Sequence, residues 1–271
     1  MDYLLISLVC LLSYFVGCIN FGKILASAKH VDLSKKASGN LGAANMFRNM
    51  GAKLGYLTLT LDALKGVLTS LTGYLVFGGA GGYPDSLIGL YACGLSAVIG
   101  HIFPIINKFK GGKGISTALG MFVVSMPLVM LVVFIVAFIV VWIFKVTSVA
   151  SLLVITVGVV AQNLMLPEPN LTVTLLTFAI FVITWFAHRK NIERLILGRE
   201  NETNIRFKIR RDQKMSERLE MKQELKEIKI EERHDKKEVK LEEKKLKSSI
   251  KEVKSPQSRF KQKRKLHTKQ K

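Results

Sequence analysis

The residues best able to do chemistry lie in one polar stretch, residues 101–117, between runs apolar enough to cross a membrane. The stretch contains, in order, His101, Lys108, Lys110, Gly111, Gly112, Lys113, Gly114, Ser116 and Thr117. Glycines let successive backbone N–H groups approach an anion, and the lysines add positive charge. A helix that begins near Ile115 would direct its first N–H groups at the same ligand. The stretch therefore predicts a phosphate site at a membrane surface.

This run of glycines and lysines is not a nucleotide-binding P-loop. That motif needs a Gly five positions before the Gly that precedes its Lys, and a Ser or Thr directly after the Lys. Here Asn107 and Gly114 occupy those two places. Nucleotide hydrolysis is therefore not expected, although the phosphate interpretation stands.

A second polar segment, residues 36–48, has a similar character. Ser38, Asn40 and Asn45 offer hydrogen bonds, and two glycines between them would let the backbone approach a ligand. Arg48 offers a planar guanidinium suited to phosphate or carboxylate. Taken alone, the pattern is equally typical of a solvated loop with turn residues.

A third polar segment, residues 188–200, follows the last apolar run. His188 and Asn191 are three residues apart, so they share one face of a helix that continues past the membrane. A lone His at the end of a span is more often a surface anchor than a catalyst. Beside two other anion-suited segments, the pair instead favours a polar catalytic centre.

The possible metal ligands do not form a metal site in the sequence. His101 and His188 have no third ligand at helical spacing. Cys10, Cys18 and Cys93 lie in apolar runs without paired spacing, so we expect buried, inert thiols. Neither a disulfide nor a metal or other cofactor is predicted.

Charge and hydrophobicity divide the chain that must position these segments. Its 271 residues are 49% hydrophobic, yet the formal charge is +20. Residues 1–199 carry 15 Lys and Arg against 6 Asp and Glu, and residues 200–271 carry 25 against 14. We therefore expect an all-α integral membrane domain over residues 1–200 and a charged, helical or disordered C-terminal extension over 201–271.

Apolar runs predict the membrane spans. Five spans are predicted directly, at residues 3–25, 54–77, 86–106, 146–164 and 171–187. The remaining run, residues 115–144, contains Pro127. It is long enough for one kinked helix or for two short helices that meet near Met126 and Pro127.

Basic residues favour two helices in that run, and so about seven spans. The loop after the first span carries Lys29, Lys35, Lys36, Arg48 and Lys53 and should be cytoplasmic, whereas the loop around Asp85 carries no Lys or Arg. With seven spans, Lys145 and the extension are also cytoplasmic and the N-terminus is outside. Some spans would then be shorter than the roughly twenty residues that a lipid-facing helix needs, which is acceptable inside a bundle.

Two charged residues fall within the second predicted span. Asp62 and Lys65 are three residues apart, so they share a helix face and can form an ion pair. Charges at membrane depth are costly and usually paired or functional. A structural ion pair and direct substrate contact remain equally good interpretations.

The three polar segments resemble, in order and spacing, the three motifs of the bacterial acyl-phosphate:glycerol-3-phosphate acyltransferases. The resemblance covers essentially residues 1–200 and rests on Ser38-Gly39-Asn40-Leu41-Gly42-Ala43-Ala44-Asn45 with Arg48, on the run from His101 to Gly114, and on His188, Asn191, Gly198 and Glu200. The segment from Asp62 to Gly66 also resembles a feature of that family's second helix.

The resemblance implies a seven-helix membrane enzyme without a cofactor and with cytosol-facing motifs. Such an enzyme transfers a fatty acyl group from acyl phosphate to the 1-hydroxyl of glycerol 3-phosphate. The products are 1-acyl-glycerol 3-phosphate (lysophosphatidic acid) and phosphate, in the first acylation of bacterial phospholipid synthesis.

The resemblance also assigns roles by position. Ser38 and Arg48 would bind glycerol 3-phosphate, Gly111, Gly112, Lys113 and Gly114 would hold the acyl phosphate, His188 and Asn191 would complete the polar centre, and Glu200 would brace the third segment. Asn40, Asn45, His101 and Lys110 are further predicted substrate contacts. Cys18, Asn20 and Ala44 depart from the family's usual Ser, Pro and Thr, but none of them carries an assigned role.

The chemistry suits these residues. Acyl phosphate is a mixed anhydride with a good leaving group, so positioning two anions and stabilising an oxyanion is the main task. The resemblance implies no acyl-enzyme, with the substrate phosphate able to accept the hydroxyl proton. A nucleophilic Ser38 with His188 as its base is the alternative.

The C-terminal extension lies outside the resemblance. Residues 201–271 are rich in Lys, Glu, Leu and Ile, which is typical of a long solvated helix. Leu225, Val239, Leu246 and Val253 recur every seven residues, but Glu232 interrupts this coiled-coil pattern. Basic segments such as residues 259–265 suit anionic lipid or nucleic acid. We predict a solvated, partly disordered extension.

Two other classes of protein remain open from the residues. A transporter for a phosphorylated solute would use the same loops, but would typically show internal repeats and a midplane site on broken helices. A membrane-anchored binding protein would act through the extension. The acyltransferase is the leading hypothesis, as a multi-pass monomer in the cell membrane.

Overall fold

The computed structural model describes residues 3–36, 38–81, 83–201 and 205–253, and within them every regular element is a helix. The elements are α1 (Tyr3–Cys18), α2 (Phe21–Ser27), the 3-10 turn η1 (Leu33–Lys35), α3 (Ala43–Met50), α4 (Ala52–Gly81), α5 (Tyr83–Ile102), the 3-10 turn η2 (Ile105–Asn107), α6 (Ile115–Ser125), α7 (Pro127–Phe144), α8 (Thr147–Leu164), α9 (Leu171–Ala187), α10 (Arg189–Ile196) and α11 (Ile205–Val253). The predicted all-α class is confirmed.

The long apolar run does divide at the predicted proline. Helix α6 ends at Ser125, and α7 begins at Pro127. Proline is favoured at the first position of a helix because that N–H has no partner there. The ring also disfavours a helical conformation in the preceding residue, and Met126 has φ −145° and ψ 67°. The two-helix prediction for residues 115–144 is therefore confirmed.

The structure contains a helix for each of the seven predicted spans. Four segments of the described chain are long and apolar enough to cross a membrane on their own: residues 4–27, 85–107, 127–144 and 147–164. The pair α9 and α10, bent by 57°, would be a fifth. Helix α6 is short and α4 carries two buried charges, so their crossing depends on neighbouring helices. The count of seven stays a prediction.

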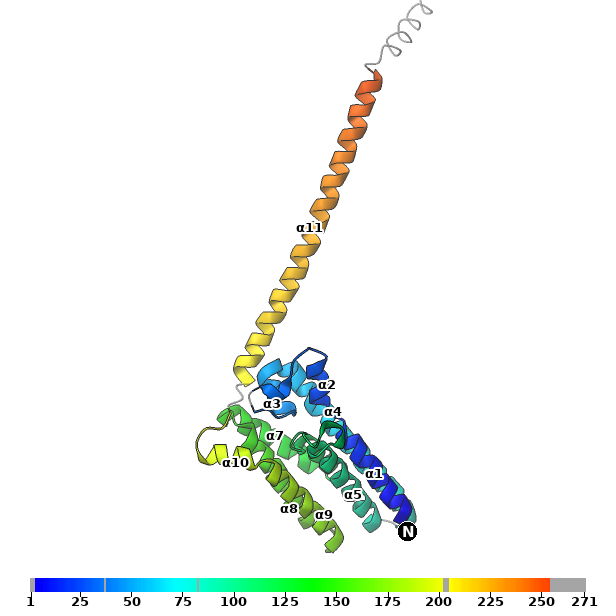
Figure 1. Ribbon diagram of the computed structural model, residues 1–271, viewed down its shortest axis with the longest axis vertical. Coiled ribbons are helices and arrows are strands. Elements are labelled where there is room, and N and C mark those ends of the chain that lie inside the picture. The colour runs from blue at the N-terminus through cyan, green and yellow to red at the C-terminus, as the bar shows by residue number, and fades with distance from the viewer. Residues whose placement is uncertain (1–2, 37, 82, 202–204, 254–271) are drawn as a thin grey trace, which may run out of the picture. The chain divides into compact units, whose positions relative to one another are not determined.

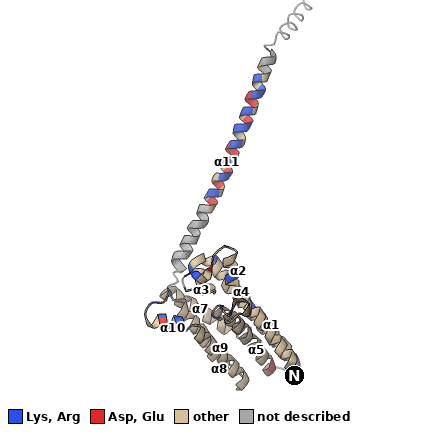
Figure 2. Cartoon of the chain, in the orientation of Figure 1, with Lys and Arg blue, Asp and Glu red and all other residues tan. Residues whose placement is uncertain are grey.

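Helix α4 packs against α1, α3, α5 and α6, while α7 packs on α8. A core of side chains that includes Tyr91, Phe122, Met130, Ile155 and Ile180 joins α5 to α9. Outward-facing side chains such as Leu128 and Ile143 are exposed, and the bundle helices carry few charges (Figure 2). These features fit an integral membrane domain.

The ends of the bundle differ in character. Helices α2, α3 and α10 gather at one end, and the N-terminus lies at the other (Figure 1). The three polar segments identified in the sequence lead into or belong to elements at the end with α2, α3 and α10. The topology therefore brings together segments that are far apart in the chain.

The chain separates into two compact units, Met1–Asp212 and Gln213–Lys271. The described part of the second unit belongs to α11, along which Lys and Arg alternate with Asp and Glu (Figure 2). Leu225, Val239 and Leu246 are exposed on this helix. Residues 205–253 of the predicted extension are thus helical, and the basic segment 259–265 lies outside the described residues.

Candidate active site

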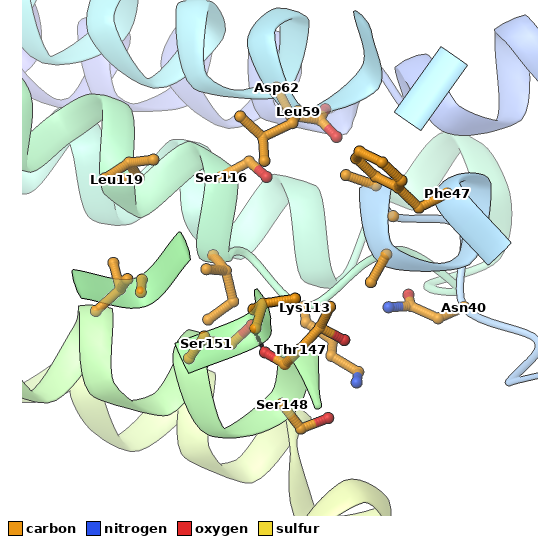
Figure 3. A pocket seen from close by; sticks show the side chains of 18 of the residues that line it. Asn40, Phe47, Leu59, Asp62, Lys113, Ser116, Leu119, Thr147, Ser148 and Ser151 are labelled. Atoms are coloured by element: carbon orange, nitrogen blue, oxygen red, sulfur yellow. Dashed lines mark hydrogen bonds between the residues drawn. The ribbon is translucent and has the colours of Figure 1, made fainter. Parts of the chain in front are cut away.

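A pocket opens at the end of the bundle that carries the polar segments, between α3, α4, the loop before α6, α7 and α8 (Figure 3). Its polar lining includes Ser38, Asn40, Arg48, Asp62, His101, Lys113, Thr147, Ser148 and His188. Its apolar lining includes Leu59, Leu119, Phe134, Ala137, Phe138, Val141 and Val154. Leu119 lies at the opposite end of the pocket from Asn40 (Figure 3). One cavity therefore combines a polar mouth with an apolar groove.

The glycine loop takes its shape from His101. The Gly112 N–H donates to the His101 carbonyl oxygen over 3.0 Å, and a Cβ on Gly112 would overlap Nε2 of the His101 ring. Gly114 then adopts a left-handed conformation with φ +80° and caps α6. A larger residue is disfavoured at Gly112 by the His101 ring and at Gly114 by the left-handed backbone conformation. The sequence Gly-Lys-Gly thus directs Lys113 into the pocket.

A buried network fixes the protonation of His101. The Lys65 ammonium donates to the carbonyl oxygens of Gly17 at 3.0 Å and Ile19 at 2.7 Å, and lies 2.8 Å from His101 Nδ1. An ammonium only donates, so Nδ1 accepts and the ring hydrogen is on Nε2, facing Gly112. The Asp62 Oδ1 is 2.9 Å from Lys65 Nζ but lacks hydrogen-bond geometry, so this contact is an ion pair.

This network answers one question that the sequence left open. Asp62, Lys65 and His101 are at most 4% exposed, which favours the structural ion pair for Lys65. Asp62 and His101 nevertheless line the pocket, whereas Lys65 does not. The three N–H donors of the ammonium match its three acceptors, and Asp62 compensates the charge.

A second network holds Lys113. Its ammonium donates to Asn191 Oδ1, and the Asn191 amide donates to Ser148 Oγ at 2.6 Å and Glu200 Oε1 at 3.0 Å. The other carboxylate oxygen of Glu200 accepts from Arg194 Nε at 3.2 Å. Asn191 thus contacts the Lys113 ammonium directly and Glu200 holds Asn191, so that together they orient Lys113.

Burial makes Lys113 unusually easy to deprotonate. It lowers the pKa of this ammonium to about 7, with the Glu200 carboxylate opposing the shift and Arg194 and Arg48 adding to it. Burial also lowers the pKa of Arg48, but a guanidinium remains protonated at neutral pH. Without a bound anion, Lys113 therefore changes charge in the neutral range while Arg48 does not.

Arg48 and His188 reach the pocket from different elements. Arg48 on α3 donates to Thr147 Oγ1 at 3.1 Å and to the Asn201 carbonyl at 3.0 Å. His188 Nδ1 lies 2.8 Å from the Thr184 carbonyl oxygen, which can only accept. Nδ1 therefore carries the hydrogen of the neutral ring, and Nε2 has a free lone pair. His188 can thus accept a hydrogen bond or proton, whereas His101 donates.

The structure brings most of the predicted site residues to this one pocket. Ser38, Asn40, Arg48, His101, Lys113, Gly114 and His188 all line it. Asn191 and Glu200 do not, because they lie behind Lys113, and Gly112 lies against His101. For these three, the geometry supports a positioning role, and direct contact with a substrate stays a prediction.

Two further residues predicted to contact a substrate do not line the active pocket. The buried amide of Asn45 donates to the carbonyl oxygens of Leu33, Lys36 and Asn40, so it holds its own loop in shape. Lys110 is exposed and, with Gly111, lines a second cavity. Contact of either residue with a substrate therefore stays a prediction.

Other residues at the site were missed in the sequence. Thr147 and Ser148 begin α8 and bond to Arg48 and Asn191, and Arg194 bonds to Glu200. Two hydroxyl residues shortly after Lys145 were the available signal, but their partners lie far away in the chain. Within the described residues, no cluster of three or more His, Cys, Asp and Glu side chains could hold a metal ion.

Comparison with known proteins places these features in a family. The family described as Glycerol-3-phosphate acyltransferase matches residues 7–198. A glycerol-3-phosphate acyltransferase from Finegoldia magna is 35% identical over 205 residues, covering 74% of this chain and 98% of the relative. One from Aquifex aeolicus is 39% identical over 193 residues, covering 70% and 94%.

Two solved structures are also similar. The crystal structure of PlsY (YgiH), an integral membrane glycerol 3-phosphate acyltransferase, in its glycerol 3-phosphate form has a TM-score of 0.66 and 34% identity. Its lysophosphatidic acid form has a TM-score of 0.64 and 33% identity. Each comparison covers 73% of this chain and 94% of the solved one.

Proposed function

This chain belongs to the glycerol-3-phosphate acyltransferase family, and from that premise we propose that its acyl donor is an acyl phosphate. It acylates glycerol 3-phosphate, the reaction for which its relatives are named. The product is lysophosphatidic acid, which is bound in one form of the similar crystal structure. This assignment decides against the transporter and the membrane-anchored binding protein as primary functions.

The pocket with two chemically different parts carries the proposal for the donor. Its mouth holds two cations, Arg48 and Lys113, and its groove is formed by apolar residues of α4, α6, α7 and α8. Two phosphate-bearing substrates need two cationic contacts, and a fatty acyl chain needs apolar surface in the membrane region. An acyl phosphate matches both parts without the large nucleotide portion of acyl-CoA.

The two substrates are assigned by the polar residues. The acyl phosphate lies against Gly114 and Lys113, with the Nε2–H of His101 behind the glycine loop. Its chain extends past Leu119 into the groove. Glycerol 3-phosphate binds to Arg48, whose guanidinium suits a phosphate, and to Ser38. Asn191 and Glu200 act by orienting Lys113.

The transfer requires no covalent intermediate with the enzyme. The 1-hydroxyl oxygen of glycerol 3-phosphate attacks the acyl carbonyl carbon, and the bond between that carbon and the phosphate oxygen breaks. The phosphate leaves with the electron pair, and the hydroxyl proton passes to it. His188 Nε2 accepts a hydrogen bond from the hydroxyl and orients it. Lys113 and the backbone N–H groups stabilise the oxyanion.

The alternative acyl-enzyme route would need Ser38 activated by His188. Among the described residues the structure shows no hydrogen bond between these two side chains, and the His188 ring is held by Thr184. We therefore propose direct transfer. A trapped acyl adduct on Ser38, detected by mass spectrometry after a quench, would reverse this mechanism.

We also propose that the end of the bundle with the active pocket faces the cytoplasm and that the N-terminus is outside. The basic residues of the loops support this orientation, since Lys29, Lys35, Lys36 and Lys53 belong to that end. Reaction of single introduced cysteines with a membrane-impermeant reagent tests it. Labelling of a cysteine at Lys53 from outside intact cells would contradict it.

The donor is tested with purified full-length protein in lipid nanodiscs. The protein is supplied with glycerol 3-phosphate and either acyl phosphate, acyl-CoA or acyl carrier protein. We expect lysophosphatidic acid with acyl phosphate. Formation only with another donor would overturn the proposal for the donor while leaving the family assignment intact.

The site is tested by two substitutions and a matched control. Arg48→Ala and His188→Ala should abolish measurable turnover, because one removes a substrate cation and the other the acceptor for the hydroxyl. Arg199→Ala, which changes an exposed arginine of the third segment, is the control. Full activity of Arg48→Ala would remove this residue from the site.

A further inference from the structure

A second cavity of about 890 Å³ lies behind the loops that form the active pocket. Its lining includes Lys23, His30, Asp32, Asn107 and Lys110, together with Gly39 and Gly111. Neighbouring residues of the same loops, Ser38 and Asn40 in one and Lys113 and Gly114 in the other, line the active pocket instead. The two cavities therefore share these two loops as walls. The proposed reaction takes place in the active pocket and does not use the second cavity.

The charges of the second cavity favour an anion. Lys23 and Lys110 contribute two exposed ammonium groups to the cavity. The opposing carboxylate of Asp32 already accepts hydrogen bonds from the Ser34 N–H at 3.1 Å and Oγ at 2.6 Å. It also lies 3.6 Å from the Lys35 ammonium. The positive groups of the cavity thus exceed its compensated negative charge.

An apolar border adjoins this cationic cavity. Ile24, Ile105, Ile106 and Phe109 are each at least 53% exposed, and they alternate along the chain with Lys23, Lys108 and Lys110. The Lys23 ammonium donates to Asn107 Oδ1, which ties α2 to the loop that carries Phe109. Cations beside exposed apolar side chains are the pattern of a membrane interface, with charge at the headgroups and apolar groups at the acyl chains.

The backbone of this loop is held in an uncommon conformation. Lys108 and Phe109 have φ values of 52° and 57°, in the left-handed region that residues with a side chain seldom adopt. Such outliers persist only where surrounding contacts hold them, and they cluster at ligand sites. Here they follow Ile105 and Ile106 of the apolar border in the chain and precede the glycine loop at residues 111–114.

We propose that the second cavity binds the phosphate headgroup of an anionic phospholipid of the surrounding membrane. Lys23 and Lys110 contact the phosphate, and Ile106 and Phe109 pack against the acyl chains. An amphiphilic ligand satisfies both the positive cavity and its apolar border, whereas a free phosphate satisfies only the first. The site is separate from catalysis, although a bound headgroup would restrain the wall that the two cavities share.

Native mass spectrometry of the full-length protein tests this binding directly. The protein is purified in detergent and titrated with phosphatidylglycerol, with phosphatidylcholine and with inorganic phosphate. We expect selective retention of phosphatidylglycerol that millimolar phosphate does not displace. Equal retention of phosphatidylcholine, or displacement by inorganic phosphate, would overturn the proposal.

Matched variants locate the bound lipid. Lys23→Gln with Lys110→Gln should weaken retention roughly tenfold or more, since each lysine near a phosphate contributes substantially. Ile106→Ser with Phe109→Ser should also weaken it, because the apolar border is lost. Lys53→Gln should not, since Lys53 is exposed and lines neither cavity. Equal loss in Lys53→Gln, or no loss in either double variant, would contradict the site.

One further variant separates the two cavities. Lys113→Ala removes a cation from the active pocket, which could itself hold a phospholipid. Retention of phosphatidylglycerol should be unchanged in this variant. Loss in Lys113→Ala would place the lipid in the active pocket and overturn the assignment. Unchanged thermal unfolding midpoints in detergent establish that each variant is folded.

Discussion

Two buried polar networks support the active pocket from opposite sides, and they are built differently. The network behind His101 lies between bundle helices and balances the charges of Asp62 and Lys65. The network behind Lys113 joins Asn191 to Glu200 and Arg194 near the end of the bundle. The first fixes a neutral ring as a donor, and the second orients a cation whose charge can change. The network at His101 thus holds the pocket with charges that balance each other, whereas the network at Lys113 holds a cation that can lose its charge.

The largest expected effect comes from breaking the network within the bundle. Lys65→Met leaves the buried Asp62 carboxylate without its cation, and loss of one partner of a buried ion pair costs about 3–5 kcal/mol. We expect a markedly lower thermal unfolding midpoint and little activity. Asp62→Leu combined with Lys65→Met should recover much of the stability, and Lys53→Met is the exposed control. An unchanged midpoint in the single variant would show that the pair contributes little.

Breaking the second network should affect catalysis more than stability. Glu200→Gln weakens the bonds to Asn191 and Arg194, and hydrogen bonds to charged groups are each worth about 1.5–3 kcal/mol. We expect kcat/KM for acyl phosphate to fall roughly tenfold to hundredfold while the unfolding midpoint changes little. Glu193→Gln, an exposed change of the same type on α10 in the third polar segment, is the matched control. Stability loss without kinetic loss would make Glu200 a structural residue only.

The adjustable charge of Lys113 predicts a smaller, pH-dependent effect. Its pKa is lowered to about 7, so the charged form of the empty site predominates below pH 7 and is lost above it. The KM for acyl phosphate should therefore rise several-fold between pH 6 and pH 8. The charged and titratable side chains around Lys113 are those of Glu200, Arg194, Arg48 and His188. The substitution Lys113→Arg, described next, leaves all four in place.

Lys113→Arg provides the comparison for this pH profile. A guanidinium keeps its charge throughout the range. The ratio of KM at pH 8 to KM at pH 6 should therefore be closer to one in the variant, with the same substrates at each pH. An identical ratio in the two proteins would show that another group causes the dependence.

The smallest effect is expected outside both networks. Truncation after Arg206 removes nearly all of α11 but no residue that lines the pocket or belongs to either network. We expect the kcat and KM for both substrates to stay within about twofold of the full chain, because every residue of the pocket and of both networks is retained. A large loss of activity would mean that the extension takes part in the reaction.

The sequence allowed much of the fold to be predicted because the signals are local. The apolar runs indicated the helices, and Pro127 marked the break between α6 and α7. The motifs also predicted Ser38, Arg48, Lys113 and His188, all of which line the pocket. Asn45 and Lys110 do not line the pocket, because a motif gives the position of a residue in the chain and not the direction of its side chain.

Residue types and spacing by themselves determined the helical class, the break at Pro127 and the polar segments, because helix formation and hydrophobic burial depend on neighbours along the chain. Only the tertiary structure decided which ring nitrogen of His101 and of His188 carries hydrogen, why the pKa of Lys113 is lowered, and that Thr147 and Ser148 support the site. Most of these properties arise from contacts between residues far apart in sequence. Protonation and orientation depend on local burial and partners, which no linear pattern records.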